Sequence, residues 1–408
     1  MENIPMSIRP ARINKKSVLT LLLGLAVSGC ASHTPYSTPQ TAPVQKDPIL
    51  DAHFDEMLII PVVINHQSFN FLVDTGASFT TIDKRVAKKI TRPLLTTEIA
   101  EIYREGLTHI NTVYDSIKPE SDIAVKPLPF SIGSEEIRDN DLWLALDLSH
   151  FSEAIGTNID GIIGIDTFRK LNWMVDNKKQ RLTISKDAPG ANTYQKCIAY
   201  DNRYNKMPVL WFDVDDSELA LYVDTGADSN NIDIEVIKMI EKIKGKNAVT
   251  HNTENSTAAD IGGIVTENSY ILKGITFAGM PLGEINVSAN QNKHFAIGMD
   301  FLSRFDRYAF IPSRMMFCYD TQGIERKEIK AQRHIAIRAR DKQIEVFYNP
   351  DDVLKKTGLR NGDILLKVND ITYAPAQINQ VREHLKQTPK GKLKLTIVRN
   401  HEQRDIYL

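Results

Sequence analysis

The string Val73-Asp74-Thr75-Gly76-Ala77 returns 150 positions later as Val223-Asp224-Thr225-Gly226-Ala227. The two copies match without gaps over a longer stretch, in which residues 57–83 correspond to residues 207–233. Both stretches begin with Met and end with the pair Ile-Asp. A repeat of this length indicates that the chain contains one structural unit twice, with an aspartate at the same point of each unit.

Each Asp-Thr-Gly string follows two apolar runs that are separated by a polar turn. Residues 58–64 and 69–73 flank His66-Gln67 in the first copy, and residues 209–214 and 219–223 flank Asp216-Ser217 in the second. This pattern predicts a β-hairpin that leads into each aspartate. A short amphipathic stretch follows each string, at residues 84–90 and 234–240.

A second shared signal lies further along each copy and consists of two apolar residues followed by glycine. It reads Ile162-Ile163-Gly164-Ile165-Asp166 in the first copy and Ala296-Ile297-Gly298-Met299-Asp300 in the second. With the Asp-Thr-Gly-Ala strings, these residues resemble the clan AA aspartic proteases, and specifically the retropepsin-like members. The resemblance covers about residues 51–322.

The resemblance implies a fold and an assembly. In this family the glycine turn belongs to the psi loop that braces the aspartate loop, so Gly164 and Gly298 are expected where neighbouring chain leaves no room for a Cβ. Retropepsins are usually homodimers with one aspartate per subunit, whereas both copies here share one polypeptide, as in pepsins. We therefore expect a mostly β fold with two retropepsin- or pepsin-like β-barrel lobes, and a monomeric catalytic unit.

The resemblance assigns Asp74 and Asp224 as the catalytic residues. Two carboxylates a few ångströms apart cannot both ionise cheaply, so they share one proton. The ionised oxygen takes a proton from a bound water, which attacks the scissile carbonyl, while the protonated partner hydrogen-bonds the carbonyl oxygen. This chemistry requires no metal and no cofactor. Which aspartate is the acid stays open, because the pair titrates as a unit.

The residues after each aspartate are expected to support the two active-site loops. Thr75 and Thr225 resemble the family threonines whose hydroxyls lock the loops together. Ala77 and Ala227 stand where pepsins carry a Ser or Thr that donates to the carboxylates, and losing those donors raises the pKa of the pair. We therefore expect activity at mildly acidic to near-neutral pH. The supporting residues are Thr75, Gly76, Ala77, Thr225, Gly226 and Ala227.

Two features of the viral family members are changed or hard to locate. The viral Gly-Arg-Asn turn, whose Arg pairs with a later Asp, is Gly-Ile-Asp and Gly-Met-Asp here, so the bracing ion pair is absent or supplied elsewhere. Flaps, the hairpins that close over substrate, are expected between each aspartate and its glycine turn. Gly262-Gly263 is the expected tip in the second lobe, and residues 106–114 are the candidate region in the first.

Residues 1–29 are expected to form a lipoprotein signal peptide. Basic residues precede the apolar run of residues 18–27, which is too short to span a bilayer as a mature helix. The run ends in Val27-Ser28-Gly29-Cys30, which resembles the bacterial lipobox, so cleavage before Cys30 would leave its sulfur to receive lipid. The alternative is a soluble exported protein with an incidental cysteine.

The residues after Cys30 bear on the tether and the location. Residues 30–50 are polar and rich in proline, which fits a flexible tether. Ala31 follows the cysteine where a retained lipoprotein would carry Asp, and this points to the outer membrane. We therefore expect a lipid-anchored protein of the bacterial cell envelope that faces the periplasm, although the anchor itself does not fix the membrane face.

Two cysteines remain beyond the signal peptide, Cys197 and Cys318. An exported protein meets an oxidising compartment, so a disulfide is allowed. In the fold that the resemblance implies, these cysteines lie on the first and last strands of a lobe, within a base sheet shared by the lobes. A bridge and two buried free thiols remain equal alternatives.

A third domain is expected at residues 331–408. The string Gly358-Leu359-Arg360-Asn361-Gly362-Asp363 resembles the signature of bacterial PDZ domains, with a short helix at residues 351–357 before it. A second helix is expected at residues 381–386 and a strand at residues 393–398. The resemblance implies a small α+β domain that takes a peptide ligand by strand addition. No carboxylate-binding loop is evident, so the alternative is a packing module that props the protease lobes.

Composition excludes several other functions. The chain has 50 basic and 51 acidic residues, without a basic block beyond the signal peptide, which disfavours a nucleic-acid partner. No Gly-x-Ser-x-Gly string and no zinc-binding pair of histidines on a helix occur, so serine and metal hydrolysis are set aside.

The sequence thus predicts an aspartic endopeptidase of the bacterial envelope that binds a protein or peptide substrate in extended form. The expected domains are residues 1–29 (signal peptide), 30–50 (tether), 51–190 (lobe 1), 191–325 (lobe 2) and 331–408 (PDZ-like). The first alternative is a non-catalytic lipoprotein that binds peptides in the same cleft. The second is a protein that becomes active only as a dimer.

Overall fold

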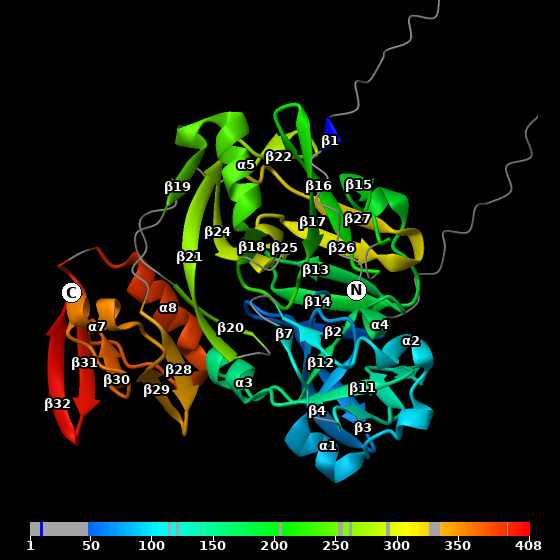
Figure 1. Ribbon diagram of the computed structural model, residues 1–408, viewed down its shortest axis with the longest axis horizontal. Helices are drawn as coiled ribbons and strands as arrows, with labels where there is room; N and C mark the ends of the chain where they lie inside the picture. Colours follow the sequence, from blue (N-terminus) through cyan, green and yellow to red (C-terminus); the bar gives the residue numbers. More distant parts are fainter. Residues whose placement is uncertain are drawn as a thin grey trace, which may run out of the picture.

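The computed structural model describes residues 9–10, 48–112, 116–119, 122–138, 140–203, 206–251, 256–260, 263–290, 294–325, 335–389 and 391–408 (Figure 1). The expected signal peptide apart from residues 9–10, Cys30, the tether up to residue 47, and Gly262 lie outside the described residues. The described chain is mostly β. Within it, no helix combines the length and the apolar character needed to cross a membrane.

An eight-stranded sheet carries the first Asp-Thr-Gly string, with the strand order β10-β9-β3-β4-β12-β5-β11-β8. The strands are β3 (Ile59–Ile64), β4 (Gln67–Val73), β5 (Thr81–Asp83), β8 (Ala124–Val125), β9 (Phe130–Ile132), β10 (Glu135–Ile137), β11 (Trp143–Leu146) and β12 (Gly161–Ile163). The helices beside it are α1 (Lys84–Ile90), α2 (Glu101–Arg104), α3 (Ser149–Ile155) and α4 (Ile165–Phe168). We call these elements the first half.

An eleven-stranded sheet carries the second string. Its main order is β19-β21-β24-β18-β25-β17-β16-β22-β23, with β1 beside β17 and β20 beside β21. Its strands are β1 (Arg9–Pro10), β16 (Val209–Val214), β17 (Ser217–Val223), β18 (Asn230–Asp233), β19 (Val249–His251), β20 (Ser256–Asp260), β21 (Gly263–Lys273), β22 (Thr276–Phe277), β23 (Met280–Pro281), β24 (Glu284–Asn290) and β25 (Phe295–Ile297). With α5 (Ile234–Lys244) and α6 (Met299–Leu302), these strands form the second half.

The two sheets share one topology. The order β11-β5-β12-β4-β3 of the first half corresponds to β24-β18-β25-β17-β16 of the second. In each half, the strand before the shared glycine runs parallel to the strand that ends at Asp-Thr-Gly and antiparallel to the strand that follows it. The repeat in the sequence is therefore a repeat of the fold.

The predicted hairpins are present, and their turns begin one residue earlier than expected. Residues 65–66 connect β3 to β4, and residues 215–216 connect β16 to β17. Asn65 and His66 have positive φ angles of 49° and 63°, which suit a two-residue turn between strongly twisted strands. The polar residues predict the approximate position of each turn. The exact position depends on which residues adopt a positive φ angle.

The helices after the aspartate loops begin at the repeated Ile-Asp pairs. The side chain of Asp83 accepts a hydrogen bond from the backbone N–H of Arg85 at the start of α1, and Asp233 accepts one from Glu235 at the start of α5. An aspartate at this position satisfies a backbone donor that the helix itself cannot pair. α1 has the predicted bounds, whereas α5 continues to Lys244 and ends at Gly245.

A six-stranded sheet joins the halves. It contains β2 (Leu50–His53), β13 (Asn172–Asp176), β14 (Arg181–Ser185), β15 (Lys196–Ala199), β26 (Arg307–Ile311) and β27 (Met316–Asp320). The order is β15-β27-β26-β13-β14-β2, so three strands from each half meet where β13 pairs with β26. Cys197 and Cys318 lie opposite each other on β15 and β27 and form a disulfide with an S–S distance of 2.01 Å. The sequence left a disulfide and two buried free thiols as alternatives, and the structure contains the disulfide.

Both halves also contribute to one apolar core. Trp173 stacks on Phe168 with a centroid separation of 4.8 Å, and the ring of Phe310 from the second half lies 5.8 Å from Phe168. All three side chains are buried. Because this core continues across the junction, the two halves form one folding unit.

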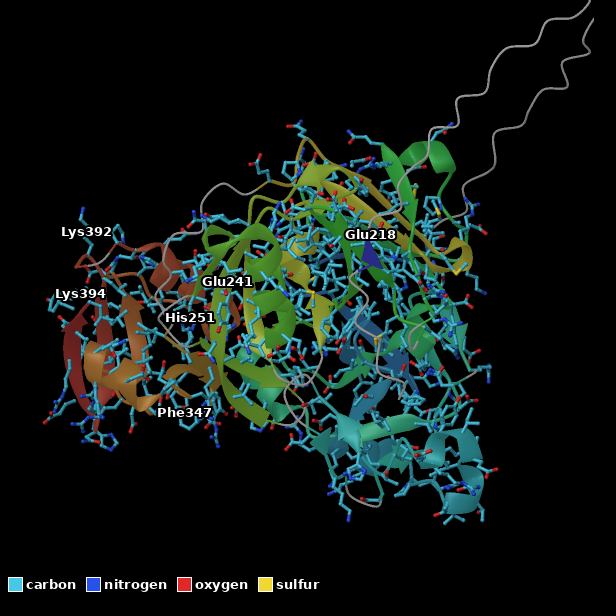
Figure 2. The ribbon with its side chains drawn as sticks, turned by 45° about the horizontal axis from the view of Figure 1, so that its top comes forward. Glu218, Glu241, His251, Phe347, Lys392 and Lys394 are labelled. Carbon is cyan, nitrogen blue, oxygen red and sulfur yellow. A yellow bond between two sulfur atoms is a disulfide. The ribbon has the colours of Figure 1, made fainter. Side chains whose placement is uncertain are left out.

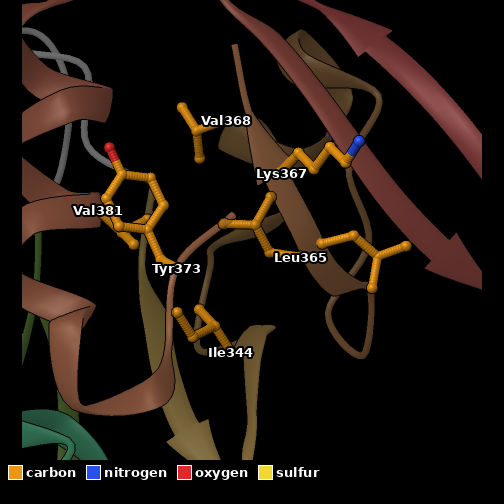
Figure 3. Close-up of a pocket in the computed structure, with 7 residues that line it drawn as sticks. Ile344, Leu365, Lys367, Val368, Tyr373 and Val381 are labelled. Atoms are coloured by element: carbon orange, nitrogen blue, oxygen red, sulfur yellow. The ribbon is translucent and has the colours of Figure 1, made fainter. Parts of the chain in front are cut away.

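The C-terminal domain, residues 335–408, has its own sheet and core. Its strands are β28 (Ile337–Arg340), β29 (Gln343–Val346), β30 (Ile364–Val368), β31 (Lys394–Arg399) and β32 (Glu402–Tyr407), in sequential order. Its helices are α7 (Asp351–Thr357) and α8 (Ile378–Gln387). Side chains from β29, β30 and α8, together with Tyr373, line a narrow gap in the core under α8 (Figure 3).

The Gly-Leu-x-x-Gly-Asp string forms the turn between α7 and β30. Gly358 ends α7 with a φ of 72°, Gly362 has a φ of 97°, and Leu359 is buried. The carboxylate of Asp363 accepts a hydrogen bond from the backbone N–H of Arg360 at 2.8 Å and pairs with Arg399 on β31 at 2.6 Å. The aspartate thus ties the turn to the sheet.

Candidate active site

The two Asp-Thr-Gly strings meet at the junction of the halves. Asp74 follows β4 directly, and its backbone N–H donates to the carbonyl oxygen of Ile163 on β12 at 3.0 Å. Asp224 follows β17, and its N–H donates to the carbonyl oxygen of Ile297 on β25 at 2.9 Å. The strand before each shared glycine therefore fixes the backbone of the aspartate beside it.

Each threonine side chain bonds to the opposite loop. The hydroxyl of Thr75 donates to the carbonyl oxygen of Val223 at 2.6 Å, and that of Thr225 donates to Val73 at 2.8 Å. Each hydroxyl also accepts the backbone N–H of the other threonine at 3.1 Å. Both threonines have no exposed surface. These four bonds join the two loops.

The carboxyl groups of Asp74 and Asp224 are hydrogen-bonded to each other. The backbone N–H of Gly76 donates to Asp74 at 2.7 Å, and the N–H of Gly226 donates to Asp224 at 2.9 Å. The Ala77 N–H also donates to Asp74, at 3.1 Å. Backbone N–H groups therefore fix the orientation of both carboxyl groups.

The glycines of the two strings allow this approach. A Cβ added to Gly76 would lie 2.6 Å from an oxygen of Asp224, and a Cβ added to Gly226 would lie 2.3 Å from the carboxyl carbon of Asp74. Each glycine thus makes room for the aspartate of the other half. An alanine at either position would push the carboxyl groups apart.

Burial dominates the electrostatics of the pair. Burial raises the pKa of Asp224 well above its usual range, and the charge of Asp74 adds to this rise. Burial also raises the pKa of Asp74, against the hydrogen bonds from Asp224, Gly76 and Ala77, which lower it. Because removing both protons would leave two like charges in a buried site, the pair holds one proton over a broad pH range. A raised pKa was expected from the missing Ser or Thr donors, but burial is its main cause here.

The shared glycines pack beneath the aspartate loops. A Cβ on Gly164 would lie 2.4 Å from the backbone of Phe79, and one on Gly298 would lie 2.3 Å from that of Ser229. The residues after these glycines bond the loops themselves, because the N–H groups of Ile165 and Met299 each donate to the alanine that follows Asp-Thr-Gly, both at 2.8 Å. Both glycines therefore lie where the neighbouring chain leaves no room for a Cβ.

The brace of each loop is made by residues that the sequence reasoning did not assign. In the first half Asp166 accepts hydrogen bonds from the backbone and the hydroxyl of Thr80, both at 2.8 Å, and from Asn140 at 2.8 Å. In the second half Asp300 accepts from Asn230 at 3.1 Å and pairs with Arg304 at 3.2 Å.

The repeat contained a signal for these residues. Thr80 and Asn230 both stand six positions after the aspartate of their half, and Asp166 and Asp300 both stand two positions after the shared glycine. The repeated Gly-x-Asp departs from the viral Gly-Arg-Asn, and an aspartate in both copies indicates a shared kind of partner. A side-chain network replaces the viral ion pair in the first half, and Arg304 supplies an ion pair in the second.

A hairpin lies at each expected flap region. In the second half β20 and β21 pair with Asp260 opposite Gly263, so Gly263 of the predicted tip lies in this hairpin, whereas Gly262 is outside the described residues. In the first half β6 (Ile110–Asn111) pairs with β7 (Ser116–Ile117), which overlaps the predicted region only in part, and residues 113–115 lie outside the described chain. β21 is much longer than the strands of the first hairpin, so the two hairpins are unequal.

The remaining predicted residues lie away from the pair. Cys197 and Cys318 are on the outer two strands at one edge of the six-stranded sheet, and the Gly358 to Asp363 turn is in the C-terminal domain. Among the described residues, no group of three or more His, Cys, Asp or Glu side chains is arranged to hold a metal ion.

Comparison with known proteins supports one part of this site. A family model described as aspartyl protease matches residues 60–167, which run from β3 through the first Asp-Thr-Gly string and Gly164 to α4. The match covers about a quarter of the chain and ends before the second copy. Residues 60–167 are therefore similar to the aspartyl protease domain that this model describes. A search of curated proteins found no match to the chain.

Proposed function

We propose that this protein is an aspartic endopeptidase in which Asp74 and Asp224 form a complete catalytic pair within one chain. The observation that carries the proposal is the reciprocal geometry of the two loops, in which each threonine bonds the other loop and each glycine makes room for the other aspartate. The aspartyl protease match to the first half supports the same chemistry. The fold would then be a two-lobed, retropepsin-like protease in a single chain.

The pair would act by activating water. A singly protonated pair can take a proton from a water bound between the carboxyls and at the same time donate a hydrogen bond to the carbonyl oxygen of the substrate. The water then attacks the carbonyl carbon, and the proton passes to the leaving amine as the bond to nitrogen breaks. The raised pKa values of both carboxyls favour a pair that keeps a proton, because full ionisation would leave two like charges in a buried site.

The substrate would be a peptide in extended form that lies between the halves. The β20–β21 hairpin would pair with its main chain, and side-chain pockets would supply selectivity. The shorter β6–β7 hairpin would cover the other side of the same cleft. Since the hairpins are unequal, closure over the substrate would be asymmetric.

The location and the C-terminal domain complete the proposal. Cleavage before Cys30 and lipidation of its sulfur would anchor the protein in the bacterial envelope, and we place it at the outer membrane, facing the periplasm. The C-terminal domain would be PDZ-like, with the Gly358 to Asp363 turn as its signature. Mass spectrometry of the mature N-terminus tests the anchor, because a lipidated Cys30 and an unmodified exported chain differ by the mass of the acyl groups.

A statine-type transition-state mimic tests the catalytic proposal directly. Its hydroxyl replaces the attacking water, so it should bind tightly only to a singly protonated pair. At a concentration 100 times its Kd it should stabilise wild-type protein by about 2.7 kcal/mol, and the Asp224→Asn variant should lose most of this effect. Equal stabilisation of both proteins, or none of either, would favour the alternative of a non-catalytic peptide-binding protein.

A further inference from the structure

The C-terminal domain packs against α3 of the first half. Gly156 ends α3 with a φ of 78°, and a Cβ at this position would lie 2.7 Å from the carbonyl oxygen of Pro375 and 2.8 Å from the side chain of Ile378. The same Cβ would lie 3.6 Å from the Cβ of Ala339 on β28. The end of α3 therefore lies between β28 and the start of α8.

A buried arginine fixes this contact. Arg338 on β28 is 6% exposed, and its guanidinium lies 3.5 Å from the ring centroid of Phe347. It pairs with Glu345 of its own domain at 2.8 Å and with Glu153 of α3 at 3.1 Å. Figure 2 shows Phe347 on the side of the C-terminal domain that faces the rest of the molecule, with Lys392 and Lys394 on the far side.

α3 covers the outer edge of β28. Arg338 and Ala339 are successive residues of a strand, so their side chains point to opposite faces of the sheet. Glu153 contacts Arg338, and Gly156 lies beside Ala339. Helix α3 therefore crosses the edge of β28 between the two faces of the sheet. Among the described residues, β28 pairs with a strand on one side only, with β29. An extended peptide could add to this edge only after α3 had moved.

The same helix also contacts the large hairpin of the second half. α3 and β20 lie against each other, and Figure 1 shows the end of this hairpin next to α3. The hairpin leaves the second-half sheet through β21, which pairs with β24. It therefore spans from one half to the other, and its described residues contact α3 of the first half.

Helix α8 brings a further charge to the junction. Burial lowers the pKa of Arg382, and the negative charges of Asp228 and Glu56 oppose this shift. Asp228 follows the second Asp-Thr-Gly-Ala string, and Glu56 precedes β3 in the first half. Charges from both halves thus act on Arg382 of the C-terminal domain.

We propose that the C-terminal domain holds the β20–β21 hairpin through α3, and that a peptide binding at the edge of β28 releases both. Such a peptide would be extended and would carry an acidic side chain, because Arg338 loses the Glu153 carboxylate when α3 leaves. Binding at β28 and the position of the hairpin are then linked, so each changes the other by the same free energy. The consequence for catalysis rests on the proposed function, whereas the link between the domain and the hairpin does not.

Hydrogen–deuterium exchange of the full chain tests the link without an activity measurement. Glu153→Gln removes the charge that pairs with Arg338, and Gly156→Ala places a methyl group against Pro375 and Ile378. Both variants should raise the exchange of β28 and of the β20–β21 backbone, by about tenfold for each 1.4 kcal/mol of docking free energy lost. The elements of the six-stranded sheet should exchange as in wild type.

Two control variants separate docking from local effects. Glu402→Gln breaks an exposed pair with Arg404 in the same domain. Gly358, like Gly156, follows a helix and has a positive φ angle, here 72°, so Gly358→Ala strains the backbone in the same way. The added Cβ, however, would meet no atom within 4 Å. Neither control should change the exchange of β20–β21.

The outcomes distinguish this link from the proposed function. If β28 and α3 exchange faster in the Glu153 and Gly156 variants while β20–β21 does not, the hairpin is independent of the C-terminal domain and the proposal is wrong. If neither segment changes, the contact with α3 does not hold the domain, which also overturns it. A chain that cleaves no peptide but gives the expected exchange would retain the link and lose the protease proposal.

Discussion

At the scale of single residues, the site depends on glycines that make room for the opposing aspartate. Gly76→Ala places a Cβ 2.6 Å from an oxygen of Asp224, so the variant must separate the carboxyl groups to fold. Because a displacement of about 1 Å can cost about 100-fold in rate, kcat/KM for a peptide substrate should fall at least that far. Gly190→Ala is the control, since its Cβ would meet only Thr193 at 3.6 Å. Equal activity of both variants would show that the glycine does not position the pair.

The raised pKa of Asp224 predicts a pH dependence of stability. Between the usual aspartate value of about 3.9 and the raised value, the folded protein binds more protons than the unfolded chain. The contribution of this group to the free energy of unfolding is therefore fully present at low pH and is lost as the pH rises through the folded pKa. Asn does not titrate, so the stability of Asp224→Asn relative to wild type should increase from about pH 4 to pH 7.

Thermal unfolding of the two proteins across this pH range measures the effect. The Tm of Asp224→Asn relative to the Tm of wild type should increase as the pH rises. A difference that stayed constant or shrank would mean that the folded protein does not hold the Asp224 proton. Asp187→Asn, a substitution on the exposed surface outside the site, gives the baseline.

Much of the site could be predicted from single residues because the repeat aligned them. The pair and the threonines occur at the same position of both copies, and each shared glycine follows two apolar residues further along its copy. Asn140 and Arg304 could not be found in this way, since each braces only one half. The cause of the raised pKa was also missed, because burial depends on the packing of both halves and not on the residue next to the aspartate.

At the scale of elements, strands fix the loops and a disulfide closes the edge of the shared sheet. The bridge between Cys197 on β15 and Cys318 on β27 spans a sequence separation of 121 residues. Replacing both residues by Ser should lower the free energy of unfolding by about 2–4 kcal/mol. Activity at low temperature should remain, because the bridge lies on outer strands and does not contact the pair.

Denaturant unfolding with and without reductant checks this prediction. Wild-type protein should lose the same stability on reduction, and the Ser variant should not respond to reductant. A wild-type protein that is indifferent to reductant would mean that the thiols are free. The sequence left this alternative open because pairing depends on strand register, which places Cys197 directly opposite Cys318.

At the scale of the whole molecule, the two halves share a core and a sheet, so Asp74 and Asp224 meet within one chain. Specific activity should therefore stay constant when the protein is diluted, for example from about 1 μM to about 1 nM. An enzyme completed by a second copy would instead lose activity steeply as the dimer dissociates. Size-exclusion chromatography at both ends of the range gives the matching oligomeric state.

The arrangement of the C-terminal domain could not be predicted from the sequence. Its helices and the glycine turn follow from local pattern, and the structure has them close to the expected bounds. Its contact with α3 rests on Glu153, Arg338 and Gly156, which are far apart in the chain and carry no repeated or periodic signal. The structure shows this domain packed against α3, and peptide binding at the edge of β28 stays a prediction.

The central claim is that one chain holds a working pair of aspartates. Its most direct test is cleavage of a mixed peptide library from mildly acidic to neutral pH by wild-type protein, Asp74→Asn and Asp224→Asn. We expect cleavage by wild type and a loss of at least about 1,000-fold in each variant, with all three proteins folded. A folded wild-type protein that cuts nothing, or a variant that retains its activity, would contradict the claim.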